Sequence, residues 1–430
     1  MSLLTLFVLV VLIFALLEVP LFTVFAGLAL GLLYLIDMDL TDMQTVLLEF
    51  NRLSSASILV ALPLFTFTGC ILTETKAPRR IMELMEAMFG WMPGGVAIAG
   101  LFACAVLTTL TGASGVTIVA LGSVLYPILI EKGYGERFAL GLLVTGGSLG
   151  LLFPPSLPII LYGVVTQTEI EKIFNAAFVP GIFLLLTLSL YAFFYDLRMR
   201  RSGQHKHAEM TFSFAELWRT TKAAAWEIPA LVLIFGGVYG GYGSISEIAG
   251  LTALYVIIVE CFILREVKFL GDMPKIMVDA GVLTGSIILI LGFAMGFTGY
   301  LLDEGIPTLL LEKLKSISEN KYVFLFALNI FLLGVGCVMD IFSAIVVIVP
   351  IMVPIALSVG VDPIHLCIIF LVNLEMGYAT PPVGINLFIA SLKFQRPITL
   401  LYMAAVPFLL ILGIALLIIT YVPQLSLLFQ

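Results

Sequence analysis

The sequence predicts an all-α polytopic membrane protein made of two inverted-topology repeats. Its 430 residues are 61% hydrophobic and only 11% charged, whereas soluble domains carry about 25% charged residues. So little charge cannot cover a water-exposed surface, and apolar stretches long enough to cross a bilayer follow one another. Prolines also recur at one fixed separation between the two halves, which indicates an internal duplication.

Composition and motifs exclude several other classes of protein. The net charge of −7, with 21 lysines and arginines, leaves no basic footprint for nucleic acid. The sequence contains no glycine-rich phosphate-binding loop of Walker type, so the chain does not itself hydrolyse ATP. The apolar start, residues 1–17, lacks a basic flank and a small-residue cleavage site, and we expect a retained first helix there.

Apolar stretches set the expected order of the helices. Eight uninterrupted stretches are expected to be whole spans: 3–17, 19–36, 57–73, 173–196, 228–242, 246–264, 281–301 and 401–424. Four others are interrupted by glycine, proline or polar residues: 94–130, 137–165, 322–358 and 364–391. Two amphipathic segments of mixed charge, 74–92 and 303–321, suit arms that lie along the membrane surface.

The two halves match as repeats. Pro127 and Pro354 are 227 residues apart, and the same separation pairs Pro154 with Pro381, Pro155 with Pro382 and Pro180 with Pro407. The chain therefore divides into a first repeat (1–196), a basic connecting segment (197–227) and a second repeat (228–430). The positive-inside rule places the connecting segment in the cytoplasm. Nearly all basic clusters then fall inside only if 94–130 and 322–358 are re-entrant hairpins, which makes the repeats inverted and both termini periplasmic.

The interrupted segments predict a secondary transporter. A helix break inside a membrane is costly unless the freed backbone groups find partners, and transporters use such breaks to hold ions. Here the breaks lie at 146–156 and at 378–386, and each contains a pair of adjacent prolines. For either break taken alone, a kinked helix without a ligand is the alternative.

The hairpin tips supply candidate ligands. Residues 108–117 concentrate hydroxyls, which are hard oxygen ligands suited to Na⁺ but also bond locally to helix carbonyls. Asp340, at the other tip, is either a functional acid at membrane depth or the N-cap of the next half-helix. An intramembrane protease is disfavoured because no second aspartate is suitably placed. Glu375 either neutralises charge near the site or pairs with a neighbour, and Asn373 and Asn386 either bind substrate or cross-link helices.

These residues resemble a known family. The large membrane subunit of tripartite ATP-independent periplasmic (TRAP) transporters is similar to this chain over essentially its whole length, most clearly at residues 62–65, 147–156, 339–340, 362–365 and 380–388. Membership implies an elevator-type fold with a fixed scaffold and a moving transport domain in the bacterial inner membrane. The implied activity is sodium-driven import of a small organic acid, a carboxylate or a sulfonate.

The resemblance also implies partners and site residues. The partners are a small four-helix membrane subunit, here expected to be unfused, and a soluble periplasmic substrate-binding protein. Two or more sodium ions, with no organic cofactor, would be held by Gly112, Ser114, Thr117, Gly147, Ser148, Pro154, Met339, Asp340, Ser343, Thr380, Pro381 and Gly384. Substrate would contact Ser114, Ser156, Asn373 and Asn386. A stand-alone sodium/carboxylate symporter is the alternative, and a non-transporting scaffold would not explain the repeated breaks.

Overall fold

The computed structural model describes residues 57–201, 211–303 and 320–429, with residue 305 and a few isolated positions before residue 57. These residues form helices joined by short turns and include no strand, so the all-α prediction is confirmed for this part of the chain. Seven of the described helices are long and apolar enough to cross a membrane, or nine if each bent pair is one span. The span expected at 3–17, and nearly all of the span at 19–36 and of the arm at 303–321, lie outside the described residues.

The first half contains the predicted arm, hairpin segment and broken helix in the expected order. Its elements are η1 (Ser57–Val60), α4 (Ala61–Thr73), α5 (Ala77–Phe89), α6 (Gly95–Thr111), α7 (Ser114–Glu131), α8 (Glu136–Gly146), η2 (Leu149–Leu152), α9 (Leu157–Thr166) and α10 (Ile170–Arg201). The amphipathic arm corresponds to α5, which begins with a proline in its first turn, where a missing N–H costs nothing. The chain bends by 46° between η2 and α9, at the predicted break.

The second half is also built from helices in its described residues. It comprises α11 (Phe214–Ala223), α12 (Ile228–Gly240), α13 (Ile245–Ile257), the π-helical turn η3 (Ile258–Ile263), α14 (Met273–Asp303), α16 (Lys321–Val338), α17 (Ile341–Ser358), α18 (Pro363–Gly377), α19 (Ile385–Phe394), α20 (Ile398–Tyr421) and α21 (Gln424–Leu427). Equivalent prolines occupy equivalent elements, with Pro127 in α7 and Pro354 in α17. The Pro154–Pro155 and Pro381–Pro382 peptide bonds are both cis.

Helices α10 and α14 extend beyond the stretches that the sequence predicted for them. The segment expected to connect the repeats, 197–227, contains the last turn of α10 and the whole of α11, whose N-cap Ser213 accepts a hydrogen bond from the Glu216 amide at 3.3 Å. Helix α14 begins at Met273 rather than near 281, because Lys275 and Asp279 interrupt the apolar pattern without interrupting the helix. Average hydropathy underestimates the length of a helix whose first turns contain charged residues.

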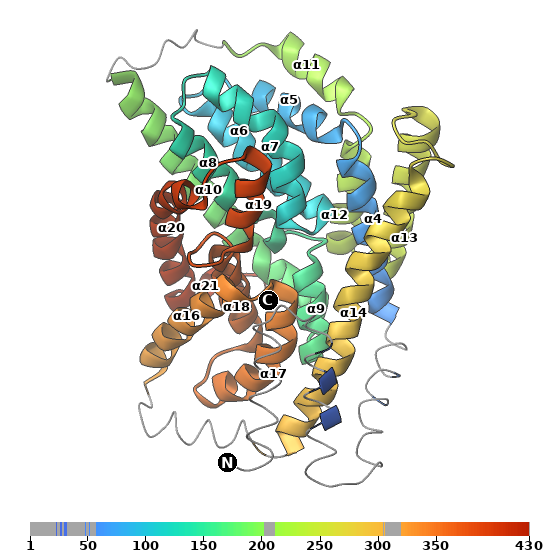
Figure 1. Cartoon of the computed structure of the whole chain (residues 1–430), viewed down its shortest axis with the longest axis vertical. Helices are drawn as coiled ribbons and strands as arrows, with labels where there is room; N and C mark the ends of the chain where they lie inside the picture. The colour runs from blue at the N-terminus through green and yellow to red at the C-terminus, as the bar shows by residue number, and fades with distance from the viewer. Residues whose placement is uncertain are drawn as a thin grey trace.

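The helices form a column beside a larger bundle. In Figure 1, α4, α13 and α14 run together along one side, and α4 packs extensively against both α13 and α14. The pair α6–α7 lies toward one end of the long axis and the pair α16–α17 toward the other. Helices α7, α16 and α17 have 18 residues each, about 27 Å at 1.5 Å per residue, which approaches the thickness of the hydrocarbon core. Each of these helices is therefore nearly long enough to cross the membrane, and the re-entrant course of the two hairpins stays a prediction.

Candidate functional site

Hydroxyl groups at the junction of α6 and α7 meet the break that follows α8. The Thr108 hydroxyl donates to the Gly147 carbonyl at 2.7 Å and lies 2.8 Å from the Thr117 hydroxyl. All three residues are buried. The Thr109 hydroxyl bonds to the Ala105 carbonyl at 2.7 Å within its own helix, the local pattern common for membrane threonines, and also lies 3.3 Å from the Gly150 carbonyl in the break. The predicted hydroxyl-rich tip thus combines local bonding with contacts to the segment that follows α8.

Asn386 connects the first junction to the second half of the chain. The Ser114 hydroxyl, at the first residue of α7, donates to the Asn386 side-chain oxygen at 2.8 Å. The Asn386 side-chain nitrogen donates to the Val144 carbonyl near the end of α8 at 3.1 Å. Gly112 makes the turn before Ser114 with φ of +66°, a conformation that residues with a side chain rarely adopt. Ser114 and Asn386, both expected to contact substrate, therefore lie together, and in this structure their side chains bond to each other.

Asp340 begins α17 and caps it. One carboxylate oxygen accepts the Ser343 amide at 3.0 Å, and the other accepts the Ser343 hydroxyl at 2.6 Å. The Ile341 amide donates to the buried Tyr378 hydroxyl at 2.7 Å, which ties the start of α17 to the second break. The capping alternative for Asp340 matches this geometry. Each carboxylate oxygen has a further lone pair, so capping does not prevent the group from also binding a cation.

The second break is held against the end of α16 by a close backbone approach. A Cβ atom on Gly377 would lie 2.5 Å from the backbone of Gly336, so neither helix tolerates a side chain where they cross. The Gly384 amide donates to the Cys337 carbonyl at 3.0 Å. Thr380 bonds to the Met376 carbonyl at 2.7 Å, one turn earlier. These contacts bring the α16–α17 junction and the Thr380–Gly384 segment together, as the predicted second ion site requires.

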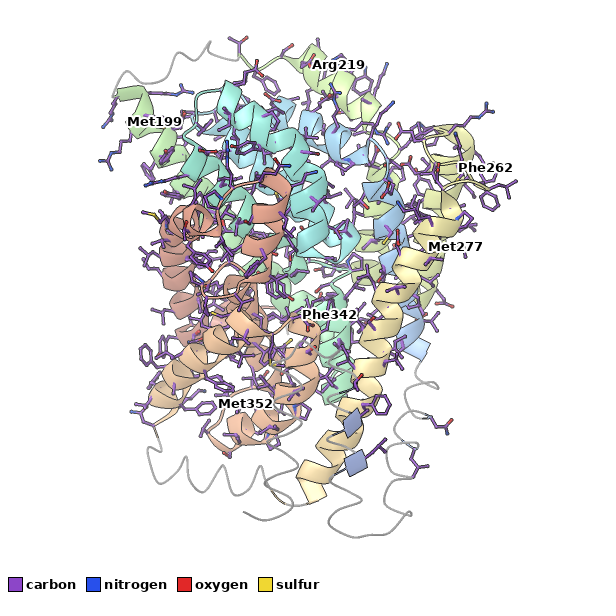
Figure 2. The ribbon with its side chains drawn as sticks, viewed as in Figure 1. Met199, Arg219, Phe262, Met277, Phe342 and Met352 are labelled. Carbon is purple, nitrogen blue, oxygen red and sulfur yellow. The ribbon has the colours of Figure 1, made fainter. Side chains whose placement is uncertain are left out.

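A cavity of about 610 Å³ lies between the two junctions and the α4–α14 wall. Gly112 and Ser114 line it from the first junction, and Asp340 and Phe342 line it from the second. Phe342 is near the middle of the long axis, so the cavity is far from both ends of the molecule (Figure 2). A volume of this size suits a small organic molecule, for which pockets of about 300–1,000 Å³ are typical.

The opposite wall was not predicted from the sequence. Cys70 and Thr73 of α4, Glu74 just after it, and Ile276, Asp279 and Leu283 of α14 line the cavity. Asp279 was the available signal, because it is an acid near the start of a long and largely apolar helix, whose other acid, Asp303, is its last residue. Three carboxylates, those of Glu74, Asp279 and Asp340, line the cavity, and no Lys, Arg or His is among its described lining residues.

Three of the predicted substrate contacts are not among the residues that line this cavity. Ser156 caps α9 by accepting the Ile159 amide at 3.3 Å. Asn373 donates to the Asn329 side chain at 2.6 Å and to the Ile369 carbonyl at 2.8 Å. Of the four predicted substrate residues, only Ser114 lines the cavity; Ser156, Asn373 and Asn386 do not. Their roles as substrate ligands stay predictions.

A multi-pass helical bundle with two broken segments around a central cavity defines a membrane transporter. The family model described as "Tripartite ATP-independent periplasmic transporter, DctM component" matches residues 6–425, and the chain belongs to this family. It is therefore a multi-pass inner-membrane protein and not an enzyme. The resemblance stated from the sequence is confirmed.

Named relatives agree with the family. The chain is 34% identical to the C4-dicarboxylate TRAP transporter large permease protein DctM of Pseudomonas aeruginosa, covering 90% of this chain and 89% of that protein. It is 33% identical to the isethionate TRAP transporter permease protein DctMQ of Oleidesulfovibrio alaskensis, covering 89% of this chain but only 59% of that longer protein. The solved structure of the Alcanivorax borkumensis YdaH transporter matches with a TM-score of 0.63 at 14% identity, covering 94% and 98% of the two chains. That likeness concerns the fold alone.

Proposed function

We propose that this chain is the permease of a sodium-coupled importer of a small organic acid, delivered by a periplasmic substrate-binding protein. The observation that carries the proposal is the cavity of about 610 Å³ between the two helix junctions, lined by Ser114 and Asp340. Named relatives support the substrate class, because one is called a C4-dicarboxylate permease and another an isethionate permease. A small carboxylate or sulfonate is the corresponding cargo here.

Sodium is proposed to bind at each junction, where hard oxygen atoms gather. The first set comprises Gly112, Ser114, Thr117, Gly147, Ser148 and Pro154, and its support is the bonding of Thr108 to both Thr117 and Gly147. The second set comprises Met339, Asp340, Ser343, Thr380, Pro381 and Gly384, and its support is the proximity of the α16–α17 junction to the second break. Hydroxyl, carbonyl and carboxylate oxygens are suited to a hard monovalent cation.

Transport is proposed to follow an elevator cycle between the two repeats. In this cycle α4 and α14 belong to the fixed scaffold, and the two junctions with their broken helices move past them. The support is that the cavity has one wall from α4 and α14 and the other from both junctions. Motion of one wall relative to the other would expose the cavity to each side of the membrane in turn.

The proposed complex has two further subunits. A small four-helix membrane subunit and a soluble periplasmic binding protein are the partners that a tripartite transporter requires. In this proposal the segment that connects the repeats, 197–227, lies in the cytoplasm, and both chain termini are periplasmic. The basic end of α10, with Arg198, Arg200 and Arg201 in its last turn, supports this orientation.

Uptake into proteoliposomes tests the proposal. The chain is reconstituted with its small-subunit partner, and radiolabelled organic acids are supplied with or without a sodium gradient and the cognate binding protein. Uptake that requires both supports the tripartite, sodium-coupled function. Uptake with sodium but without the binding protein would instead identify a stand-alone symporter, and uptake indifferent to sodium would overturn the proposed coupling.

Asp340→Asn tests the second ion site within that assay. Asparagine is as good an N-cap as aspartate, so α17 is preserved while the charge is removed. We expect the sodium concentration for half-maximal uptake to rise at least tenfold. The matched control is Asp362→Asn, which changes the aspartate that caps α18 by accepting the Ile364 amide at 2.8 Å. Equal sodium dependence in both variants would remove Asp340 from the ion site.

A further inference from the structure

Glu375 is a buried carboxyl group that the proposed sites do not use. It lies in α18, one turn before Tyr378, and only 4% of the residue is exposed. Its Oε1 atom has no hydrogen-bond partner, and no ion pair of this side chain occurs among the described residues. By contrast, Asp340 uses both of its carboxylate oxygens in capping α17.

The elements packed against α18 offer no countercharge to Glu375. These elements are α16, α17, α20, α10, α9, α21 and η2, of which α17, α21 and η2 contain no titratable side chain. The titratable groups of the others are Lys321, Tyr322 and Cys337 of α16, Tyr402 and Tyr421 of α20, Tyr162 of α9, and Glu171, Lys172, Tyr191, Tyr195, Asp196, Arg198, Arg200 and Arg201 of α10.

None of the charged groups in these elements neutralises Glu375. Lys321 donates to the Gly360 carbonyl at 2.6 Å, just before α18 begins and therefore at the opposite end of that helix. The charges of α10 are confined to its first turn and to its last residues from Asp196 onward. On α18 itself, His365 lies ten residues before Glu375, and its ring contacts the Ser426 hydroxyl and the Thr420 carbonyl, each at 3.2 Å. His365 therefore does not supply a partner for Glu375.

A buried, unpaired carboxylate is among the least stable arrangements in a protein. The charge loses most of its hydration, and among the described residues no cation pairs with it and no donor bonds to Oε1. Inside a membrane such a group persists when it takes up a positive charge, and intramembrane acids of transporters serve as cation or proton sites. A position one turn before the second break would let that charge exchange with the transport site.

We propose that Glu375 binds one exchangeable monovalent positive charge, a proton or a sodium ion, which moves with the substrate in each transport cycle. This inference rests on the proposed transport function and adds a coupling site beyond the two junctions. Either ion would neutralise the buried carboxylate. A proton and a sodium ion are distinguished by the measurements below.

The charge carried per substrate tests the inference. Glu375→Gln keeps the shape of the side chain and removes its charge, and the zero-flux potential in proteoliposomes gives the number of charges moved with each substrate. We expect the variant to move one positive charge fewer than the unmodified protein. A pH indicator inside the vesicles would record substrate-linked proton entry that is lost in the variant if the ion is a proton. If the ion is sodium, the ratio of ²²Na⁺ to substrate would fall by one and the indicator would not respond.

A second measurement needs folded protein but not transport. The infrared band of a protonated carboxyl that disappears in Glu375→Gln would support proton binding, and one fewer bound sodium ion at equilibrium would support sodium binding. Glu169→Gln is the control, because Glu169 is 71% exposed in its pair with Lys172. Unchanged charge ratio, infrared spectrum and sodium binding in Glu375→Gln would overturn this inference. The proposed function would stand if uptake by the unmodified protein still required sodium and the binding protein.

Discussion

Replacing Arg80 with methionine is expected to destabilise the protein by about 3–5 kcal/mol, because it leaves buried carboxylates without their cation. Arg80 of α5 contacts Glu227 at 2.5 Å, Glu266 at 2.7 Å and Glu260 at 3.5 Å. The side chains of Glu227 and Glu260 are each only 2% exposed. Burial opposes the charge of the guanidinium, but the carboxylates of Glu227 and Glu266 outweigh it and raise the pKa of Arg80.

The size of the effect follows from the structure. Glu227 precedes α12, Glu260 lies in η3 and Glu266 follows η3, so one guanidinium joins the surface arm to the column of helices. Methionine keeps the apolar stem of the side chain and removes only the charge and its hydrogen bonds. The entropy of unfolding of globular domains is about 2.1 cal/mol/K per residue. A loss of about 3–5 kcal/mol in the free energy of unfolding therefore lowers the melting temperature of a 430-residue chain by about 3–6 °C.

Thermal unfolding of the purified protein in detergent measures the shift. Arg79→Met is the control on the same helix, because Arg79 is 71% exposed and pairs with Glu83 at 3.0 Å. An exposed pair of this kind contributes about 0.3–0.5 kcal/mol, which corresponds to a shift below about 1 °C. Adding Glu227→Gln to Arg80→Met should restore part of the loss, because it removes one of the unpaired charges. Equal shifts for the two arginine variants would refute the reasoning.

Three further predictions concern close packing, a buried hydroxyl and pH. Gly377→Ala should lower the melting temperature and uptake by forcing a Cβ against the backbone of Gly336, whereas Gly334→Ala, with nothing within 4 Å, should leave both unchanged. Thr108→Val should cost about 1–3 kcal/mol, because it leaves a buried carbonyl unpaired, and should weaken sodium-dependent uptake. Burial raises the pKa of Glu86, so ionisation of this carboxyl group destabilises the folded protein as the pH rises through that pKa. Glutamine does not ionise, so the melting temperature of Glu86→Gln should rise relative to that of the unmodified protein between about pH 5 and pH 8.

Local sequence signals predicted the order of the elements but not the wall of the cavity. Proline pairs and apolar runs act within one segment, so the two breaks and the α5 arm could be placed from the residues alone. The approach of Asp279 to the junctions depends on how α14 packs across the bundle, which no local pattern encodes. The same holds for Arg80, whose partners lie 147 and 186 residues away in the hydrogen bonds to Glu227 and Glu266. Tyr378 was part of the predicted break, yet its bond to Ile341 required two segments 37 residues apart in the chain to meet.

The charge balance of the cavity gives the proposed coupling a physical basis. An organic acid that enters a space lined by Glu74, Asp279 and Asp340 adds negative charge where no described lining residue is positive. Repulsion between like charges opposes that step unless cations arrive with the acid. In the proposed cycle, sodium at the junctions and a positive charge on Glu375 supply them, so binding of substrate and cations becomes mutually favourable. Each positive charge that then crosses the membrane contributes about 2.3 kcal/mol per 100 mV, so the ions that make binding possible also drive accumulation.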